Sequence, residues 1–335
     1  PGAAGTAYIP GLADFVPMVK GIGSMALAGP PLVKAVTGQD IGEQELGGSK
    51  VHCEVSGVGD AEYPDDAACI DAVKAYLSYF PSHCDEAPPR LPCTDPVDRR
   101  DDALLDLVPD SPRRAYDMYK VIRSLVDHGV IFDLKPRWAR NLITCLARID
   151  GRSVGIVANN PMHTGGVLDL DAADKGAHFI QVCDAFNIPL VFLQDTPGFM
   201  VGSKMEHAGI IRHGAKMLHA MSAATVPKLT VVVRKAYGAG YFVMCGRAYE
   251  PDLLVAWPGA EISVMGAEGM VGIAARKLFG DAEPPAEMKR TLVETIQSYI
   301  DIYRVGGWGL IDDIIDPRDT RRVLALGLEL SAHKV

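Results

Sequence analysis

The feature that most constrains the fold is a repeated order of apolar strand, small-residue turn and helix in the second half of the chain. Three short runs are almost entirely apolar, at 153–159 (SVGIVAN), 189–194 (PLVFLQ) and 228–234 (KLTVVVR). Helical patterns at 172–186 and 210–223 lie between them. Strands that are apolar on both faces are typical of a parallel sheet covered by helices. The order predicts an α/β architecture with parallel strands and right-handed crossovers.

Other elements are expected around this unit. Residues 81–112 are rich in proline and charge, which is typical of a linker between domains. With 335 residues, the chain has about the length of two domains. The further elements expected are helices at 71–79 and from 241, and strands at 253–257 and 261–264.

Composition and charge exclude several classes of protein. The net charge is −9, which argues against a nucleic acid partner because such proteins carry basic patches. The sequence has no run of the roughly 18–20 apolar residues that a membrane span needs. The opening Pro1-Gly2-Ala3 shows neither an initiator methionine nor a signal peptide. We therefore expect a fragment of a cytoplasmic protein, or of a mitochondrial matrix protein if the source is eukaryotic.

The cysteines and histidines do not form a metal-binding pattern. There are seven scattered cysteines and no CxxC pair, so a zinc ribbon is not expected. Reduced thiols are the simplest interpretation, with a disulfide between Cys84 and Cys93 as the open alternative. His207 and His213 lie six residues apart, which does not match a helical metal pair. No metal is predicted.

Common catalytic motifs are absent from the sequence. It contains no Gly-x-Ser-x-Gly elbow, no GxxxxGK[ST] loop and no complete GxGxxG. What it does contain is a small-residue turn before an aromatic residue, found twice, at 2–8 (GAAGTAY) and 236–241 (AYGAGY). Free amides at a helix start can stabilise an oxyanion, because small residues let a ligand approach the backbone. The alternative for each turn is a plain tight turn.

The surrounding sequence resembles the carboxyltransferase (beta) subunits of biotin-dependent acyl-CoA carboxylases, of the propionyl-CoA and methylcrotonyl-CoA type. The resemblance runs through nearly the whole chain and keeps its motifs in one order. The segments that carry it include AAGTAYIP at 3–10, GIVANNP at 155–161, LQDTPGF at 193–199, GIIRHGAK at 209–216, SVMG at 263–266 and DDIIDPRDTR at 312–321.

The resemblance implies two crotonase-like (ClpP/crotonase) β-β-α superhelix domains, the first of them incomplete. Residues 1–90 would be the C-terminal part of the acyl-CoA domain, and residues 91–335 would be the biotin domain. The family pairs its subunits so that each active site lies between the N-domain of one and the C-domain of the other. A hexamer, as a trimer of dimers, is the implied assembly.

The resemblance also assigns the site, residue by residue. The implied oxyanion pairs are Ala4 with Gly5 on the acyl-CoA side, and Ala239 with Gly240 on the biotin side. Those amides would hold an enolate oxygen and the biotin carbonyl oxygen while the carboxyl group moves. Phe242 departs from the Asp of propionyl-type enzymes, so the acyl chain remains open. The pocket residues implied are Tyr8, Pro197, Gly198, Phe199, Tyr241 and Phe242.

The cofactors implied are biotin on a separate carrier and a coenzyme A thioester as substrate. The chain has neither an AMKM biotinylation motif nor an ATP-grasp signature, so ATP use belongs to a biotin carboxylase partner. Two alternatives stay open at this point. One is the carboxyltransferase of a biotin-dependent decarboxylase or transcarboxylase, and the other is a non-catalytic crotonase-like scaffold.

Overall fold

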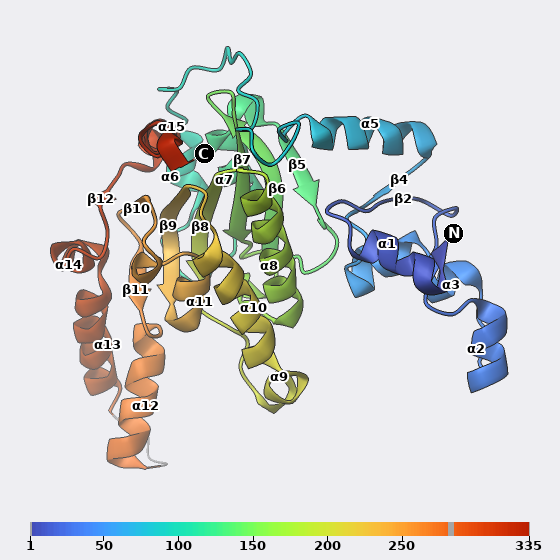
Figure 1. Cartoon of the computed structure of the whole chain (residues 1–335). Coiled ribbons are helices and arrows are strands. Elements are labelled where there is room, and N and C mark those ends of the chain that lie inside the picture. The colour runs from blue at the N-terminus through green and yellow to red at the C-terminus, as the bar shows by residue number, and fades with distance from the viewer. Residues whose placement is uncertain (1, 281–284, 335) are drawn as a thin grey trace.

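In the computed structural model, residues 2–280 and 285–334 are described, and eight of their strands form one large sheet (Figure 1). Strands β7 to β10 and β12 run parallel, and β11 is parallel to the end of β9. Strand β6 is antiparallel to both of its neighbours, β5 and β7. The sheet order is β12 (Asp313–Ile314), β10 (Leu253–Ala256), β9 (Lys228–Tyr237), β8 (Leu190–Thr196), β7 (Arg152–Asn159), β6 (Leu142–Ile149) and β5 (Ile131–Leu134), with β11 (Glu261–Ser263) off this path.

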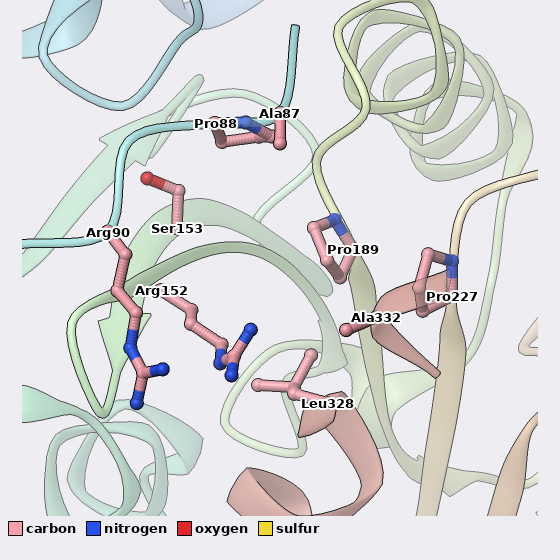
Figure 2. Close-up of a pocket in the computed structure, with 9 residues that line it drawn as sticks. All are labelled: Ala87, Pro88, Arg90, Arg152, Ser153, Pro189, Pro227, Leu328 and Ala332. Atoms are coloured by element: carbon pink, nitrogen blue, oxygen red, sulfur yellow. The ribbon is translucent and has the colours of Figure 1, made fainter. Parts of the chain in front are cut away.

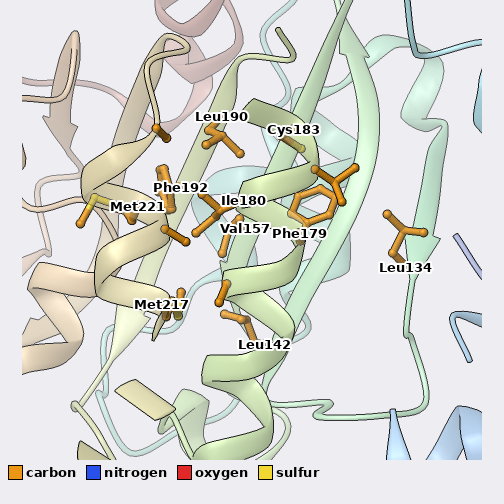
Figure 3. Close-up of a cluster of buried hydrophobic side chains, with 14 of the residues drawn as sticks. Leu134, Leu142, Val157, Phe179, Ile180, Cys183, Leu190, Phe192, Met217 and Met221 are labelled. Atoms are coloured by element: carbon orange, nitrogen blue, oxygen red, sulfur yellow. The ribbon is translucent and has the colours of Figure 1, made fainter. Parts of the chain in front are cut away.

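The central strands are buried on both faces, and alternate residues enter two different cores. On β8, Leu190 and Phe192 belong to one core, whereas Val191 and Leu193 belong to the other. Figure 3 shows the first core, where helices α8 (Leu170–Ala185) and α10 (Ile210–Ala223) contribute its helical side. Helices α7 (Met118–Leu125) and α15 (Thr320–Leu330) cover the opposite face. The continuous apolar strands follow from this double burial.

Residues 2–65 form a smaller unit beside the sheet (Figure 1). The β-structure of this unit consists of two short parallel strand pairs, β1 with β3 and β2 with β4. Its small core consists of Val16, Met18, Met25 and Cys53. Its elements are β1 (Gly2–Ala3), η1 (Ala4–Ala7), α1 (Tyr8–Gly11), β2 (Pro17–Val19), β3 (Met25–Ala26), α2 (Pro30–Thr37), α3 (Glu43–Gly47), α4 (Ser49–Val51), η2 (His52–Ser56) and β4 (Ala61–Tyr63).

The remaining helices connect or extend these units. Helices α12 and α13 extend away from the sheet (Figure 1). Among the described residues, no helix combines the length and apolar character that a membrane crossing requires. The bounds are α5 (Asp66–Leu77), α6 (Ala103–Leu107), η3 (Asp127–Gly129), η4 (Thr164–Gly166), α9 (Ser203–Ala208), α11 (Gly238–Val243), η5 (Arg247–Tyr249), α12 (Ala267–Phe279), α13 (Ala286–Ile300), α14 (Ile302–Gly307), η6 (Pro317–Asp319) and η7 (Ala332–Lys334).

The expected linker at 81–112 is largely irregular but packs firmly on the second unit. The buried guanidinium of Arg321 organises this packing. It donates to the carbonyls of Asp95 and Pro96 at 3.1 Å each, and to the carboxylate of Asp127 at 2.7 Å. All seven cysteines carry free thiols, so Cys84 and Cys93 are not paired.

The predicted elements of the α/β unit are confirmed, α10 with identical bounds and the others within three residues at either end. The predicted helix at 71–79 is α5, which begins five residues earlier, where Asp65 caps it by accepting from the Ala68 amide. Strands β5 and β6 were not predicted, and both form antiparallel pairs beside the predicted parallel strands. Residues Asp150 and Gly151, both at positive φ, form the two-residue turn that folds β6 back onto β7.

Candidate functional site

The turns after β8 and β9 meet at one edge of the sheet. The two strands are parallel, so both end at this edge. A Cβ added to Gly240 would lie 2.9 Å from the Cα of Gly198 and 2.9 Å from Cγ2 of Thr196. The Thr196 hydroxyl accepts a 3.1 Å hydrogen bond from the Gly198 amide and fixes the first of these turns. The structure thus brings together the predicted site segments 197–199 and 239–240.

The turn after β9 leads directly into a helix. Tyr237 is extended, Gly238 is left-handed at φ +54°, and α11 begins there. The first amides of a helix have no acceptor within that helix. The amides of Ala239 and Gly240 are among them, and the helix dipole favours negative charge next to them. This is the geometry that an oxyanion site needs.

The turn after β1 has the same backbone shape. Ala3 is extended, Ala4 is left-handed at φ +52°, and the helical turn η1 follows. The Thr6 hydroxyl accepts from the Ala3 amide at 3.0 Å and donates to the Ala3 carbonyl at 2.6 Å. Ala4 therefore corresponds to Gly238, and Gly5 to Ala239. The residue pairs assigned from the sequence are offset by one position between the two turns.

An apolar groove of about 410 Å³ lies beside the second turn. Of the predicted pocket residues, Phe199 and Phe242 line it, together with Ala239. Tyr241 points elsewhere, because it is buried and its hydroxyl accepts from the Arg247 amide at 2.8 Å. The groove residues that the sequence did not single out are Met200, Val201, Glu206, Ile210, Ile211, Gly214, Ala215, Leu218, Val243 and Tyr249.

The sequence of α10 did contain a sign that this helix lines the groove. Ile210 is buried, whereas Ile211 is 78% exposed although it is apolar. Ile211, Ala215 and Leu218 follow the i, i+4, i+7 spacing of a second helical stripe. A helix with apolar residues beyond its core face indicates a groove or an interface.

The remaining predicted residues lie on the N-terminal unit. Ala4 and Gly5 start the helical turn there, and Tyr8 is 59% exposed on α1. Figure 1 shows this unit apart from the edge where β8 and β9 end. Gly198 packs against Gly240 of the second turn, and neither Pro197 nor Gly198 lines the groove. The structure therefore brings part of the predicted site together and leaves the first turn separate.

A buried ionic cluster lies directly below the second turn. The carboxylate of Asp195, at a bulge between β8 and β9, accepts from Arg234 Nε at 3.0 Å and lies 3.4 Å from Lys235 Nζ. Arg234 also donates to three carbonyls of the segment 109–114. Burial lowers the pKa of Lys235, and Asp195 opposes that shift. Because every member faces another member or a carbonyl, this cluster positions the turn and leaves no free acid or base.

A second cavity, of about 100 Å³, lies at the other edge of the sheet (Figure 2). Pro189 and Pro227 mark it, since each precedes the start of a parallel strand. Its arginines, Arg90 and Arg152, are paired with Asp150 and Glu329 respectively. Ligands of open α/β sheets bind at the carboxyl ends of the strands, so we place the functional site at the groove and not here.

Comparison with known proteins identifies the family. The carboxyl transferase domain model matches residues 1–335. The methylmalonyl-CoA carboxyltransferase 12S subunit of Propionibacterium freudenreichii subsp. shermanii is 45% identical over 100% of the chain and 64% of its own length. The methylmalonyl-CoA decarboxylase subunit alpha of Propionigenium modestum is 44% identical over 96% of the chain and 62% of its length. The mitochondrial propionyl-CoA carboxylase beta chain of Homo sapiens is 41% identical over 100% of the chain and 61% of its own length.

Solved structures agree with the sequence comparison. One solved structure is that of transcarboxylase 12S with methylmalonyl-coenzyme A and methylmalonic acid bound. The alignment covers 99% of this chain and 64% of the 12S chain, with a TM-score of 0.94 and 45% identity. The alignment with the geranyl-CoA carboxylase beta subunit of P. aeruginosa covers 99% of this chain and 62% of that subunit, with a TM-score of 0.66 and 33% identity. The neighbours are crotonase-fold carboxyltransferases, so the predicted fold is confirmed. The chain spans less than two thirds of the length of these relatives.

Proposed function

Because the chain belongs to the carboxyl transferase domain family, we propose that it catalyses carboxyl transfer between carboxybiotin on a carrier protein and an acyl-CoA thioester. The observation that carries this proposal is the second turn, whose helix-start amides open beside an apolar groove. The groove suits the hydrocarbon and thioether part of biotin, because its wall is almost entirely hydrocarbon, while the polar ureido edge of biotin suits the helix-start amides. Glu206 is the one charged residue that lines it.

The proposed chemistry places little demand on side chains. Carboxybiotin releases the carboxyl group, and this leaves the ureido group of biotin electron-rich. The amides of Ala239 and Gly240 stabilise negative charge on the oxygen held at the second turn. Amides of the first turn, around Gly5, stabilise the enolate oxygen of the thioester after its α-proton (or vinylogous γ-proton) has passed to the ureido nitrogen of biotin from which the carboxyl group departed. Catalysis then depends on proximity and electrostatic preorganisation, which agrees with the ionic cluster being fully occupied below the turn.

The proposal includes a second copy of the chain. Apolar side chains around the groove are highly exposed, with Val201 at 85% and Ile211 at 78%. An N-terminal unit of another copy would cover them and bring a first turn to the groove. The 12S relative forms a hexamer, which supports self-association here. The division into an acyl-CoA domain at 1–90 and a biotin domain at 91–335 stays a prediction. So do the biotin carboxylase and carrier partners and a cytoplasmic location.

The test is an assay of carboxyl transfer. The chain is fused to the segment of the 12S subunit that lies outside the match, assembled, and mixed with a carboxylated biotin carrier. Acetyl-, propionyl-, methylcrotonyl- and long-chain acyl-CoAs are offered in parallel. Transfer to any of them supports the proposal and identifies the acyl group. A folded, assembled protein that binds the carrier but transfers to none would refute it and favour the scaffold.

The direction of the reaction has a specific alternative. A decarboxylase subunit and a transcarboxylase subunit are as similar to this chain as the carboxylase beta chains are. In these alternatives the same two turns hold the same oxygens, and the carboxyl group leaves the acyl-CoA instead of joining it. Incubating the fused protein with methylmalonyl-CoA and uncarboxylated carrier, and measuring carboxylation of the carrier, tests the reverse step directly.

A further inference from the structure

The loop 135–142, between β5 and β6, connects the N-terminal unit to the large sheet. Lys135 donates from Nζ to the Gly57 carbonyl at 2.7 Å and lies 3.1 Å from the Asp60 carboxylate. Its amide also donates to the Asp60 carbonyl at 3.0 Å. Arg137 pairs with Glu54 at 3.1 Å and with Glu62 at 3.3 Å. The loop therefore contacts the N-terminal unit through two cations and one main-chain hydrogen bond.

The same loop also packs closely against Gly57. A Cβ added at Gly57, which is left-handed at φ +71°, would lie 2.4 Å from the Trp138 ring. Asp60 in turn accepts from the Val16 amide at 2.7 Å, inside the small core of the N-terminal unit. The contact thus reaches from the loop into the interior of that unit.

A single buried amine holds this loop from the other side. Lys175, on α8, is 2% exposed. Its Nζ lies within hydrogen-bond distance of four carbonyl oxygens of the loop and the strand that follows it, those of Lys135 at 2.9 Å, Trp138 at 3.0 Å, Ala139 at 3.4 Å and Leu142 at 2.7 Å, so its three hydrogens are shared among them. Lys135 and Ala139 are both at positive φ, which turns these carbonyls inward at a cost to non-glycine residues.

Burying the charged amine of Lys175 here costs desolvation free energy. Burial lowers the pKa of its amine to about 7, and the nearby Asp133 carboxylate opposes that shift. The Asp133 carboxylate has a buried oxygen without a hydrogen-bond partner. Because the buried amine is enclosed by carbonyl oxygens of a single loop, that loop must keep the conformation that presents these oxygens if the amine is to stay hydrogen-bonded.

We propose that Lys175 is a positioning residue that fixes the N-terminal unit, through the loop 135–142, against the large sheet. It acts at a distance, because its amine shapes the loop while Lys135 and Arg137 of that loop make the contacts. Under the proposed function, on which this consequence rests, Lys175 sets where the first turn lies relative to the sheet. The loop and not the amine touches the N-terminal unit, so the effect is on placement and not on chemistry.

The test is hydrogen exchange measured by mass spectrometry on this chain without substrate. In Lys175→Met, we expect amides of 54–62 and 135–142 to exchange at least about tenfold faster, because local opening becomes easier. Peptides of β8 and β9 should change by less than about twofold. Lys74→Met is the matched control and should change neither region, because Lys74 is an exposed lysine on α5 that pairs with the exposed Asp71.

A double variant separates positioning from general destabilisation. Lys135→Met removes the contact from the other side of the loop, and combined with Lys175→Met it should add little further exchange. If Lys175→Met does not fold, Lys135→Met alone must still speed exchange in 54–62 while sparing the sheet. Equal changes in sheet and N-terminal unit, or no change in 54–62, would overturn the proposal. Because no substrate is present, failure of the proposed function leaves this result intact.

A kinetic measurement on the fused protein then tests the consequence for the site. Lys175→Met should raise KM for acyl-CoA by about tenfold or more while kcat changes less, since binding across the two units is lost before chemistry is. A fall of kcat by about tenfold with an unchanged KM for acyl-CoA would contradict a positioning role.

Discussion

Replacing Gly240 with alanine tests whether the second turn needs close contact between two main-chain segments. The new Cβ would lie 2.9 Å from the Cα of Gly198 and 2.9 Å from Cγ2 of Thr196. Ordinary carbon contacts begin near ~3.5 Å, so the turns must separate by about 0.6 Å. Overpacking of this kind costs about 1–3 kcal/mol. In a chain of 335 residues, with an unfolding entropy of about 2.1 cal/mol/K per residue, this lowers Tm by roughly 1–4 °C.

The same displacement moves the amides of Ala239 and Gly240. Misplacement by about 1 Å can reduce a rate about a hundredfold, so we expect carboxyl transfer to fall roughly 10–100-fold in Gly240→Ala. Calorimetry and the transfer assay measure the two effects on one preparation. Unchanged Tm would refute the packing argument. A lowered Tm with full activity would show that the turn is structural and not part of the site.

Gly5→Ala is the matched comparison at the first turn. A Cβ there has no atom within 4 Å, and Gly5 lies inside a helical turn at negative φ. Alanine is favoured over glycine in a helix by about 0.5–1 kcal/mol, so stability should stay constant or rise slightly. A loss of acyl-CoA turnover without a loss of stability would then identify Gly5 as a position that a ligand approaches.

Three further predictions concern other positions. Ala4→Gly should raise the free energy of unfolding by about 0.5–1 kcal/mol in urea titrations, because Ala4 is left-handed at φ +52° and glycine is not strained there. Phe242→Ala should widen the groove assigned to biotin and raise KM for the carboxylated carrier in the transfer assay, with a stability loss of about 1 kcal/mol, since Phe242 is 42% exposed. Although burial opposes it, the amides of Gly151 and Asp150 together with Arg321 lower the pKa of Asp127. The unfolded chain therefore takes up this proton first as pH falls, and the stability from Asp127 is present above about pH 4 and lost below it. Asp127→Asn should flatten that part of the pH profile in thermal unfolding, and an unchanged acid limb would contradict the argument.

The sequence predicted local structure best where one residue type fixes the backbone. Helix α10 was placed correctly because Gly209, at φ +92°, precedes it and Pro227 follows soon after its end. Strand β6 was missed although Asp150-Gly151 between two apolar runs is a strong hairpin signal. Within the apolar runs alone, parallel and antiparallel partners look the same, since both strands are buried on both faces. Pairing direction depends on the connection and not on the strand.

The site itself was only partly predictable, for a different physical reason. Small residues mark both turns, but which amide faces a ligand depends on the single left-handed residue that starts each helix, at Ala4 and Gly238. A motif match aligned by residue type cannot detect that one-position offset. The role of Lys175 was also hidden, because a lone lysine in an otherwise amphipathic helix gives no sign that four carbonyls surround it.

The placement of the two turns bears on how such a chain would work. The proposed reaction develops negative charge twice, on the carbonyl oxygen of biotin and on the thioester oxygen, and each needs its own set of amides. The second turn has its groove in this chain, while the first lies on a separate unit with Tyr8 and Ile9 exposed beside it. Exposed apolar residues border both places, and large exposed apolar patches mark surfaces that become covered. If a second copy covers the groove, carboxyl transfer requires assembly, and activity per chain must fall when dilution separates the copies. An activity that is independent of concentration down to the monomer would show that one chain completes the site by itself.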